Sequence, residues 1–338
     1  MPEPIRVVAV TGDDVVRFTL SEDREPADVE SVLDGVAAQC VAVDPNDPLR
    51  VYVGSFDDGI HVSRDGGTTW NGGAEGLVDP RVMSVAVSPS HRESGISVVY
   101  AGTEPSNLYR SEDGGRRWEP LPALRALPSE PRWSFPPRPW THHVRTIALH
   151  PADPEWLAVG IELGGVMRSL DGGATWFDHN PGAHSDAHQL LTHPRAPDRV
   201  YEVAGQGVAR SDDLGETWTR LDNGLDRHYA WAEAVDPQDA DLWYVSASRS
   251  PMAAHGQGDG QSHLWRSQTD GWAPIDGWGD APELRRMPYA LRSLPEQPGA
   301  LLVGLRGGRF LLTEDAGESW SRLDATLPDL IDFAVAPA

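Results

Sequence analysis

The sequence predicts an all-β fold, a seven-bladed β-propeller, in which seven four-stranded sheets form a ring around a central channel. Three observations lead to this prediction: an eight-residue pattern that recurs along the chain, a spacing between its copies that suits one sheet each, and two chain ends that complement one another. The pattern reads Ser/Thr-x-Asp-x-Gly-x-x-Trp, and its five copies begin at Ser63, Ser111, Ser169, Ser211 and Thr313. We therefore expect a single propeller domain over residues 1–338.

Each residue type of the repeated pattern suits a tight turn between two strands. In the first copy, the carboxylate of Asp65 can accept hydrogen bonds from backbone N–H groups of its own turn, and Gly67 can adopt a positive φ. Trp70 can bury a large ring against the edge of the sheet. The pattern therefore predicts a hairpin that leads into the fourth strand of each blade, and a purely structural role for its residues.

The tryptophans that end the copies lie 42 to 58 residues apart, which is the length of one four-stranded blade. They are Trp70, Trp118, Trp176, Trp218 and Trp320, with Trp272 ending a degenerate copy at 267–272. Within the first unit, residues 39–43, 51–54 and 60–63 are expected to form three strands, with an Asp-Pro turn at 44–48. Six blades are therefore explicit.

The two ends of the chain predict how the ring closes. Residues 5–10, 15–20 and 29–33 match the second, third and fourth strands of a unit without a first strand, and residues 331–337 look like the missing strand. We expect residues 1–35 to give three strands of the terminal blade, 36–326 six further blades, and 327–338 the closing strand. This one-plus-three clasp leaves no exposed sheet edge, so truncation after Leu330 should destabilise the ring.

The recurring pattern resembles the Asp-box (BNR) repeat of sialidase-like β-propellers. The resemblance implies the propeller fold and a scaffolding role for the box residues. Sialidases of this group typically have six blades and an arginine triad, whereas this chain has no Arg-Ile-Pro segment near its N-terminus. Xyloglucan-cleaving members use two seven-bladed domains, and photosystem assembly factors are single seven-bladed rings without catalysis.

Charge and cysteine content exclude several classes of function. Lys and Arg total 28 against 51 Asp and Glu, for a net charge of −23, which argues against binding to nucleic acid or to an anionic membrane. The single cysteine, Cys40, rules out a disulfide framework. Residues 1–20 contain neither the apolar segment of a signal peptide nor a transmembrane span, so we expect a cytoplasmic protein.

Three long insertions interrupt the repeat spacing, at residues 119–143, 246–263 and 273–288. The alignment of the blades places all three on the face where the first strands begin, opposite the repeated turns. Long loops gathered on one face of a rigid scaffold usually carry function. We therefore expect the functional site on this face, at the mouth of the central channel.

Polar and aromatic residues cluster where the first strands begin, although the same strands are apolar further along. Such a cluster around one opening is the default candidate site of this fold. The candidate catalytic residues are His143, Arg145, Glu162, Asp186 and His188. The candidate ligand-binding residues are Gln39, Arg81, Glu104, Trp140, His228, Tyr229, Trp231, Tyr289 and Arg306.

These residues leave three kinds of chemistry open. His143 and His188 with Glu162 (or Asp186) would give a mixed nitrogen and oxygen ligand set for a divalent transition metal. Alternatively, one carboxylate and a neighbouring histidine could move a proton while Arg145 holds an anionic group. In a pure recognition site, the aromatic side chains would stack on a ring or a sugar, and nothing would react.

The leading hypothesis is a propeller that binds a small polar or anionic molecule or a sugar at the channel mouth, and acts on it as a metal-dependent or acid–base hydrolase or lyase. The main alternative is a non-catalytic interaction or assembly scaffold, in which loops 119–143 and 246–263 grip a protein partner. A glycosidase of the sialidase-like group is a third reading.

Two charged residues occupy first-strand positions that are apolar in other units. Glu233 and Arg292 belong to adjacent blades and to opposite faces of their sheets. Because a buried charge persists only when it is paired, we expect them to form a buried ion pair between the two blades.

Overall fold

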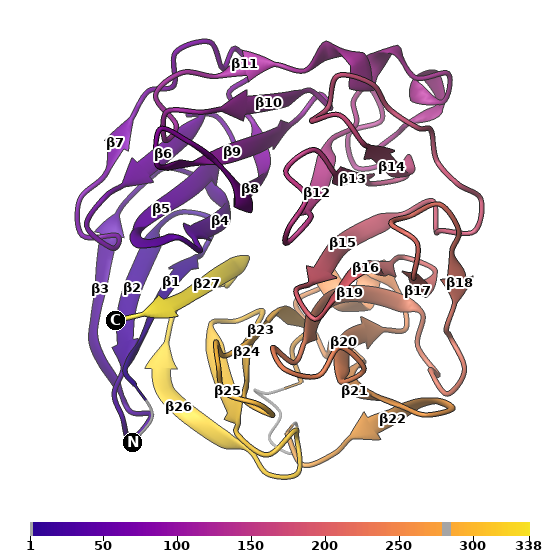
Figure 1. Ribbon diagram of the computed structural model, residues 1–338. Coiled ribbons are helices and arrows are strands. Elements are labelled where there is room, and N and C mark those ends of the chain that lie inside the picture. Colours follow the sequence, from indigo (N-terminus) through magenta and orange to yellow (C-terminus); the bar gives the residue numbers. More distant parts are fainter. Residues whose placement is uncertain (1–2, 279–284) are drawn as a thin grey trace.

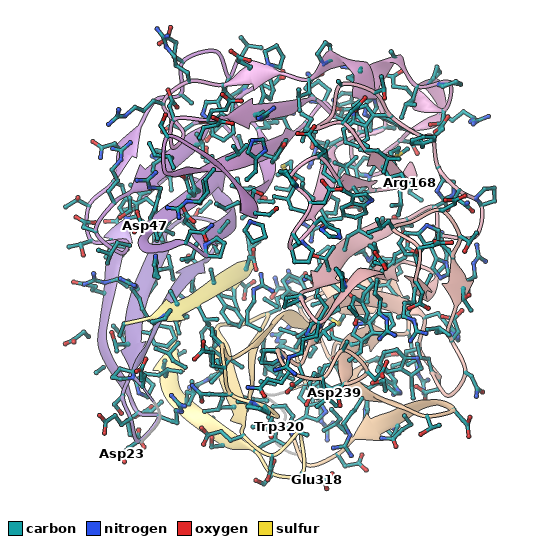
Figure 2. The ribbon with its side chains drawn as sticks, in the orientation of Figure 1. Asp23, Asp47, Arg168, Asp239, Glu318 and Trp320 are labelled. Carbon is teal, nitrogen blue, oxygen red and sulfur yellow. The ribbon has the colours of Figure 1, made fainter. Side chains whose placement is uncertain are left out.

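The structure is a ring of seven antiparallel sheets around a central axis, and it confirms the predicted seven-bladed β-propeller (Figure 1). It is a computed structural model that describes residues 3–278 and 285–338. The predicted insertion at 273–288 therefore lies partly outside the described residues. Figure 2 shows side chains over the whole ring, with Asp23 and Glu318 at its outer edge.

Blade 1 is built from both ends of the chain, as the sequence predicts. Its strand order is β27-β1-β2-β3, with β27 (Asp332–Pro337) beside β1 (Ile5–Val10), then β2 (Val15–Leu20) and β3 (Pro26–Leu33). Strands β1 and β27 pair along their full length, from Ile5 opposite Pro337 to Val10 opposite Asp332. The C-terminal strand therefore closes the ring.

The other six blades follow in chain order. Blade 2 holds β4 (Ala38–Asp44), β5 (Asp47–Ser55), β6 (Ile60–Ser63) and β7 (Asn71–Gly72), and blade 3 holds β8 (Val82–Glu93), β9 (Ile96–Thr103), β10 (Leu108–Ser111) and β11 (Glu119–Pro120). Blade 4 holds β12 (Val144–Leu149), β13 (Leu157–Ile161) and β14 (Gly165–Ser169), and blade 5 holds β15 (Ala187–His193), β16 (Ala196–Ala204), β17 (Gly207–Ser211) and β18 (Thr219–Arg220). Blade 6 holds β19 (Tyr229–Val235), β20 (Trp243–Ser248), β21 (Ser262–Gln268) and β22 (Gly271–Ile275), and blade 7 holds β23 (Pro288–Ser293), β24 (Leu301–Leu305), β25 (Arg309–Thr313) and β26 (Ser321–Thr326). Blade 4 has three strands, and one bridge between Arg168 and Phe177 stands in place of its fourth.

Two of the long loops contain short helices. The loop before blade 4 holds the 3-10 helices η1 (Pro122–Ala126) and η2 (Glu130–Arg132), and the loop within blade 6 holds α1 (Pro251–His255). Within the described ranges, the helices are all too short or too polar to cross a membrane.

The five copies of the repeated pattern form the same hydrogen-bonded turn. In the first, Ser63 Oγ donates to Asp65 Oδ1 at 2.8 Å and accepts from Gly67 N at 2.8 Å. Asp65 also accepts from Thr69 N at 2.9 Å, and Trp70 Nε1 donates to the Gly67 carbonyl at 3.2 Å. The same Ser/Thr-to-Asp hydrogen bond occurs in the copies that begin at Ser111, Ser169, Ser211 and Thr313.

The degenerate copy at 267–272 folds differently from the other five. Strands β21 and β22 pair through to Gln268 opposite Gly271, which leaves a two-residue turn too short for the Asp-centred loop. Trp272 instead donates its Nε1–H to the Leu221 carbonyl at 2.6 Å. A shorter hairpin therefore serves this blade.

The hydrophobic core of the described residues consists mainly of clusters between neighbouring blades. Between blades 7 and 1, the buried rings of Phe18 and Phe333 both pack edge-on against Phe310, at centroid distances of 5.4 and 5.3 Å. The blades approach so closely that a Cβ on Gly102 of β9 would lie 2.5 Å from Val144 Cγ1 of blade 4. Packing between blades, rather than within them, therefore holds the ring.

The predicted ion pair between Glu233 and Arg292 does not form. Glu233 Oε2 accepts a hydrogen bond from Trp243 Nε1 at 2.9 Å within its own blade, and burial raises the pKa of Glu233 well above its usual range. Arg292 reaches forward to blade 1 and contacts Asp332 at 2.5 Å. Arg292 is thus paired with a carboxylate of the next blade, whereas the Glu233 carboxyl is held by an indole N–H of its own blade.

Candidate functional site at the channel mouth

A cavity of about 510 Å³ follows the inner strands along the centre of the ring. Its wall runs along β15 from His188 at the mouth to His193 and Pro194 at the opposite end. Around the mouth it is lined by polar and aromatic side chains from several blades, namely Gln39, Arg145, His188, Trp231 and Tyr289. The sequence-predicted mouth therefore opens into a real channel.

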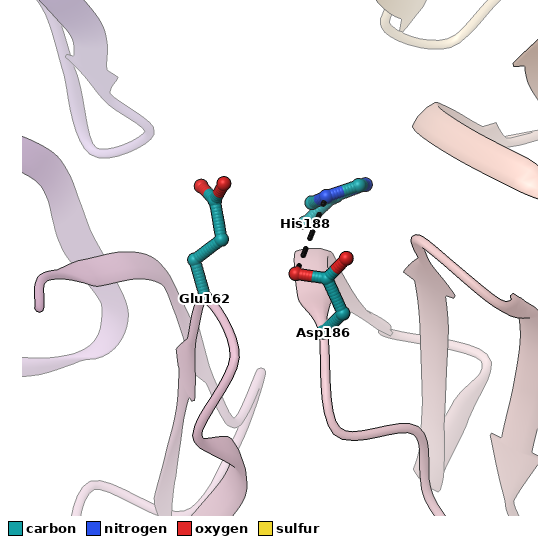
Figure 3. Close-up of side chains that lie close together, drawn as sticks. All are labelled: Glu162, Asp186 and His188. Carbon is teal, nitrogen blue, oxygen red and sulfur yellow. Dashed lines mark ion pairs between the residues drawn. The ribbon is translucent and has the colours of Figure 1, made fainter. Parts of the chain in front are cut away.

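Three side chains from blades 4 and 5 converge beside this channel (Figure 3). Glu162 follows β13, and Asp186 and His188 flank the first residue of β15. One carboxylate oxygen from each acid and one imidazole nitrogen of His188 all lie within 4.8 Å of one another. We call this group the acid–histidine cluster.

His188 is held in a single orientation. Its ring is 3% exposed, packs edge-on against Tyr229 at 5.0 Å, and makes a 2.5 Å hydrogen bond through Nδ1 to the Ala230 carbonyl. A carbonyl oxygen only accepts, so Nδ1 carries the proton. Burial lowers the pKa of His188, which keeps the ring neutral, and Nε2 therefore presents a lone pair 3.7 Å from Asp186 Oδ1.

Asp186 occupies a fixed and confined position. A Cβ on Gly205 would lie 1.9 Å from Asp186 Oδ2, so only glycine leaves room for this carboxylate. The loop residue Leu163 donates a backbone hydrogen bond to Asp186, which ties blade 4 to blade 5. Burial nevertheless raises the pKa of Asp186, with the charge of Glu162 adding to the effect.

Glu162 is ionised and is oriented by a second histidine. His143 Nε2 lies 3.1 Å from Glu162 Oε2 in a buried hydrogen bond. Burial alone would raise the pKa of Glu162, but the hydrogen bond and charge of His143 outweigh it and lower the pKa to about 2. Arg145 adds a weaker attraction, with its Nε 3.9 Å from the same oxygen.

A second group of charges surrounds the fully buried carboxylate of Glu104. Arg138 approaches it with two nitrogens, Nε at 2.7 Å and Nη2 at 2.5 Å, and Arg81 Nη1 lies 3.3 Å away. Arg138 also stacks over the rings of Phe56 and Phe135. Two arginines against one carboxylate leave this side of the mouth with a net positive charge.

Aromatic side chains from blades 6 and 7 form the facing wall. Arg145 stacks on Trp231 with its Cζ 4.6 Å from the ring centre, and Tyr289 packs against the same indole at 5.5 Å. His255, at the end of α1, joins this wall through hydrogen bonds to Tyr229 Oη at 2.7 Å and to Tyr289 Oη at 2.5 Å. Burial lowers the pKa of His255 to about 4, so the ring is neutral at physiological pH.

The structure brings most of the sequence-predicted residues together. Those that share contacts around the mouth are Arg81, Glu104, His143, Arg145, Glu162, Asp186, His188, Tyr229, Trp231, Tyr289 and Arg306. Gln39 lines the channel nearby and donates to the backbone carbonyls of Ala37 and Ala38. Trp140 and His228 are exposed on the rim instead. His143 contacts Glu162 but lies outside the acid–histidine cluster. The metal-ligand set predicted from the sequence contained His143, and in the structure Asp186 takes its place.

Sequence reasoning missed two residues of the site, His255 and Arg138. Both lie in long loops, where no strand periodicity indicates which way a side chain points. The Pro-Met-Ala-Ala-His run after Ser250 is the one available signal, because serine followed by proline favours the start of a helix. Ser250 Oγ does accept a hydrogen bond from Ala253 N and caps α1.

The rim of the mouth exposes large apolar side chains. Val78 is 79% exposed, Trp140 78% and Met252 86%, and each lies in a loop on the face where the inner strands begin. The other strongly exposed apolar residues, Val29, Leu49, Leu170 and Phe177, are at most 50% exposed and lie on other parts of the ring. Among the described residues, the three most exposed large apolar side chains thus lie on the face that carries the mouth.

Comparison with known proteins identifies the fold and one distant relative. No family model matches the chain. The photosystem II assembly lipoprotein Ycf48 of Synechococcus sp. (strain CC9902) is 23% identical over 287 residues, which cover 81% of this chain and 72% of that protein. Among solved structures, an ancestral GH74 enzyme matches 88% of this chain with a TM-score of 0.64 at 20% identity. The match covers 38% of that enzyme, so this chain spans less than half of its length.

A second solved structure, YCF48 bound to D1 peptide, matches over 96% of this chain and 85% of its own. Its TM-score is 0.58 at 16% identity. These likenesses show the fold alone.

Proposed function

We propose that this protein is an interaction or assembly scaffold that binds an extended segment of a partner protein across the channel mouth. The observation that carries the proposal is the set of three strongly exposed apolar side chains, Val78, Trp140 and Met252, on the face that carries that mouth. Isolated apolar residues on a surface are ordinary, but a set gathered on one face around a polar cavity is typical of a protein-binding surface. Trp and Met are also among the residues enriched in interfaces.

The charges of the mouth favour a partner segment that carries carboxylates. Arg81, Arg138 and Arg145 each expose between a fifth and two fifths of their side chains, at 40%, 26% and 21%. The planar guanidinium group binds carboxylates through two parallel hydrogen bonds. An acidic side chain or a C-terminal carboxylate of the partner is therefore the group that this side of the mouth would accept.

The comparisons support a protein partner over a sugar or another small molecule. Ycf48 is named as an assembly protein, and the YCF48 structure that matches this fold holds a peptide of D1. The match to the GH74 enzyme covers less than half of that enzyme, so the enzyme's activity carries less weight for this chain. We also infer that the five matching turns make this protein an Asp-box propeller.

Selection from a phage-displayed library of random dodecapeptides tests the proposed function. Selected peptides should bind with a measurable Kd in fluorescence anisotropy, and Trp140→Ala, Met252→Ala and Arg145→Ala should each weaken binding about 10-fold or more. Leu49→Ala, an exposed apolar residue on the opposite face, is the matched control and should leave Kd unchanged. Failure to enrich any peptide, or equal binding by all four variants, would overturn the proposal.

A second candidate function is acid–base chemistry on a small anionic molecule. The observation that favours it is the buried 3.1 Å contact between His143 and the ionised Glu162, next to Arg145. A small carboxylate that raises the Tm of the wild type but not that of Arg145→Gln, and that is consumed by the wild type but not by Glu162→Gln, would favour this function.

We also propose that the protein is cytoplasmic. Because the relative Ycf48 is named as a lipoprotein, fractionation of native cells is the deciding measurement. Recovery of this chain in the membrane fraction would contradict a cytoplasmic location.

A further inference from the structure

The acid–histidine cluster has the composition of a metal site. It offers two carboxylate oxygens and one imidazole nitrogen within 4.8 Å of one another, from Glu162, Asp186 and His188. In tetrahedral zinc sites with ligand distances near 2.1 Å, neighbouring donor atoms lie about 3.4 Å apart. The 3.7 Å separation between His188 Nε2 and Asp186 Oδ1 is already close to that value.

His188 provides an observation that is independent of the acidic residues. Its side chain is 97% or more buried, and its Nε2 has no hydrogen-bond partner among the described residues. Since Nδ1–H is committed to the Ala230 carbonyl, Nε2 is the ring nitrogen that faces Asp186, and the dashed line in Figure 3 marks this contact. A backbone carbonyl that fixes the tautomer in this way is the arrangement that metal-binding histidines commonly have. A buried hydrogen-bond acceptor destabilises the folded state unless a donor or a bound ion satisfies it.

The carboxylates are positioned by residues outside the cluster. His143 donates to Glu162, and the Leu163 backbone with the space left by Gly205 holds Asp186. Asp186 Oδ1 also lacks a hydrogen-bond partner among the described residues. One lone pair and one carboxylate oxygen, both buried and both unpartnered, therefore face each other across 3.7 Å. A cation bound between them would satisfy both atoms.

Arg145 is the group that opposes a cation at this position. Its Nε lies 3.9 Å from Glu162 Oε2, although its guanidinium stacks on Trp231. Two carboxylates against one guanidinium leave the cluster with a net attraction for a divalent ion. Arg145 thus weakens the site without abolishing it, and its removal should tighten metal binding.

We propose that Glu162, Asp186 and His188 bind one divalent transition-metal ion at the channel mouth. A donor set of one imidazole and two carboxylates suits Zn²⁺ or Mn²⁺, and lacks the sulfur ligands that select Cu⁺. Three protein ligands would leave the ion open to a further ligand from the channel. This inference does not depend on the proposed peptide binding, because it rests on different atoms.

Metal binding by the protein, stripped with a chelator, tests the inference. Titration with Zn²⁺ in a calorimeter should give one ion per chain, and Co²⁺ should give the visible absorption of a low-symmetry site with nitrogen and oxygen ligands. Asp186→Asn and Glu162→Gln keep the shape of each side chain and should weaken Zn²⁺ binding by more than about 100-fold. Arg145→Gln should strengthen it about 3-fold to 10-fold, from the loss of one nearby positive charge.

Two further variants keep the test decisive. Asp329→Asn removes a carboxylate at the same mouth, one that pairs with Arg306 at 3.8 Å, and should leave Zn²⁺ binding within twofold. His143→Gln should weaken binding 10-fold to 100-fold, as expected for a residue that positions a ligand. The inference is overturned if Zn²⁺, Mn²⁺ and Co²⁺ all fail to bind below about 1 mM, or if Asp186→Asn and Glu162→Gln bind as the wild type does.

Discussion

Replacement of Phe333 by alanine should destabilise the whole ring, because this residue anchors the strand that closes it. The Phe333 side chain is fully buried, packs against Phe310 with a centroid distance of 5.3 Å, and lies in the cluster that joins blades 7 and 1. Truncation of a buried phenylalanine costs about 3–5 kcal/mol. The aromatic contact places Phe333→Ala near the upper end, at about 4–5 kcal/mol, which is a large part of the typical stability of a folded domain.

Equilibrium unfolding in guanidinium chloride, followed by tryptophan fluorescence, measures this loss. The midpoint should fall while the slope m stays constant, which would show that one cooperative unit has been weakened. Val29→Ala is the control, because Val29 lies in β3 of the same blade and is 47% exposed, and it should change the free energy of unfolding by less than about 0.5 kcal/mol. A loss below about 1 kcal/mol for Phe333→Ala would refute the view that β27 holds the ring closed.

Three further predictions concern pH and packing. Burial slightly raises the pKa of Asp65, but hydrogen bonds within the turn outweigh it and lower the pKa to about 2. The ionised carboxylate therefore stabilises the fold above pH 3.8, and this stabilisation is lost as the pH falls toward 2. An acid titration followed by circular dichroism should show a smaller loss of stability in Asp65→Asn than in the wild type. Burial raises the pKa of Glu202 from 4.5 to about 8. The contribution of Glu202 to the free energy of unfolding is therefore full below pH 4.5, and it falls by ~1.4 kcal/mol per pH unit as the pH rises to 8. Glu202→Gln should remove this slope in denaturant unfolding measured at several pH values, and an unchanged slope would contradict it. Gly102→Ala should cost about 1–3 kcal/mol in thermal unfolding, because its Cβ would lie 2.5 Å from a side chain of the next blade, and a neutral result would mean that the blades separate readily.

The fold was predictable because its signal repeats. Five copies of one turn at blade spacing, with a strand missing at one end and supplied at the other, leave few alternatives to a closed ring. The exceptions are local. Blade 4 lacks a regular fourth strand, and the turn before Trp272 shortens to two residues, which a degenerate pattern does not reveal.

The candidate site was predictable by position and less so by contact. Strand register places Arg145 and His188 at one level of the ring and His143 two residues earlier in the chain, but register does not give the direction of a long side chain. Arg292 therefore reaches Asp332 rather than Glu233. Loop residues carry still less information, because no periodicity constrains them. This is why the sequence did not indicate that His255 bridges two tyrosines.

The clasp in blade 1 also determines when the molecule can become complete. Arg6 Nη2 donates to the Pro337 carbonyl at 2.7 Å across 331 positions of sequence, whereas every other blade pairs strands that are close neighbours in the chain. A ribosome therefore releases β1 long before its partner β27 is synthesised, and one edge of β1 stays unpaired while the six other blades are made. During that interval β1 is the segment most able to pair with another nascent chain, and an exchanged β27 would join two rings into a dimer.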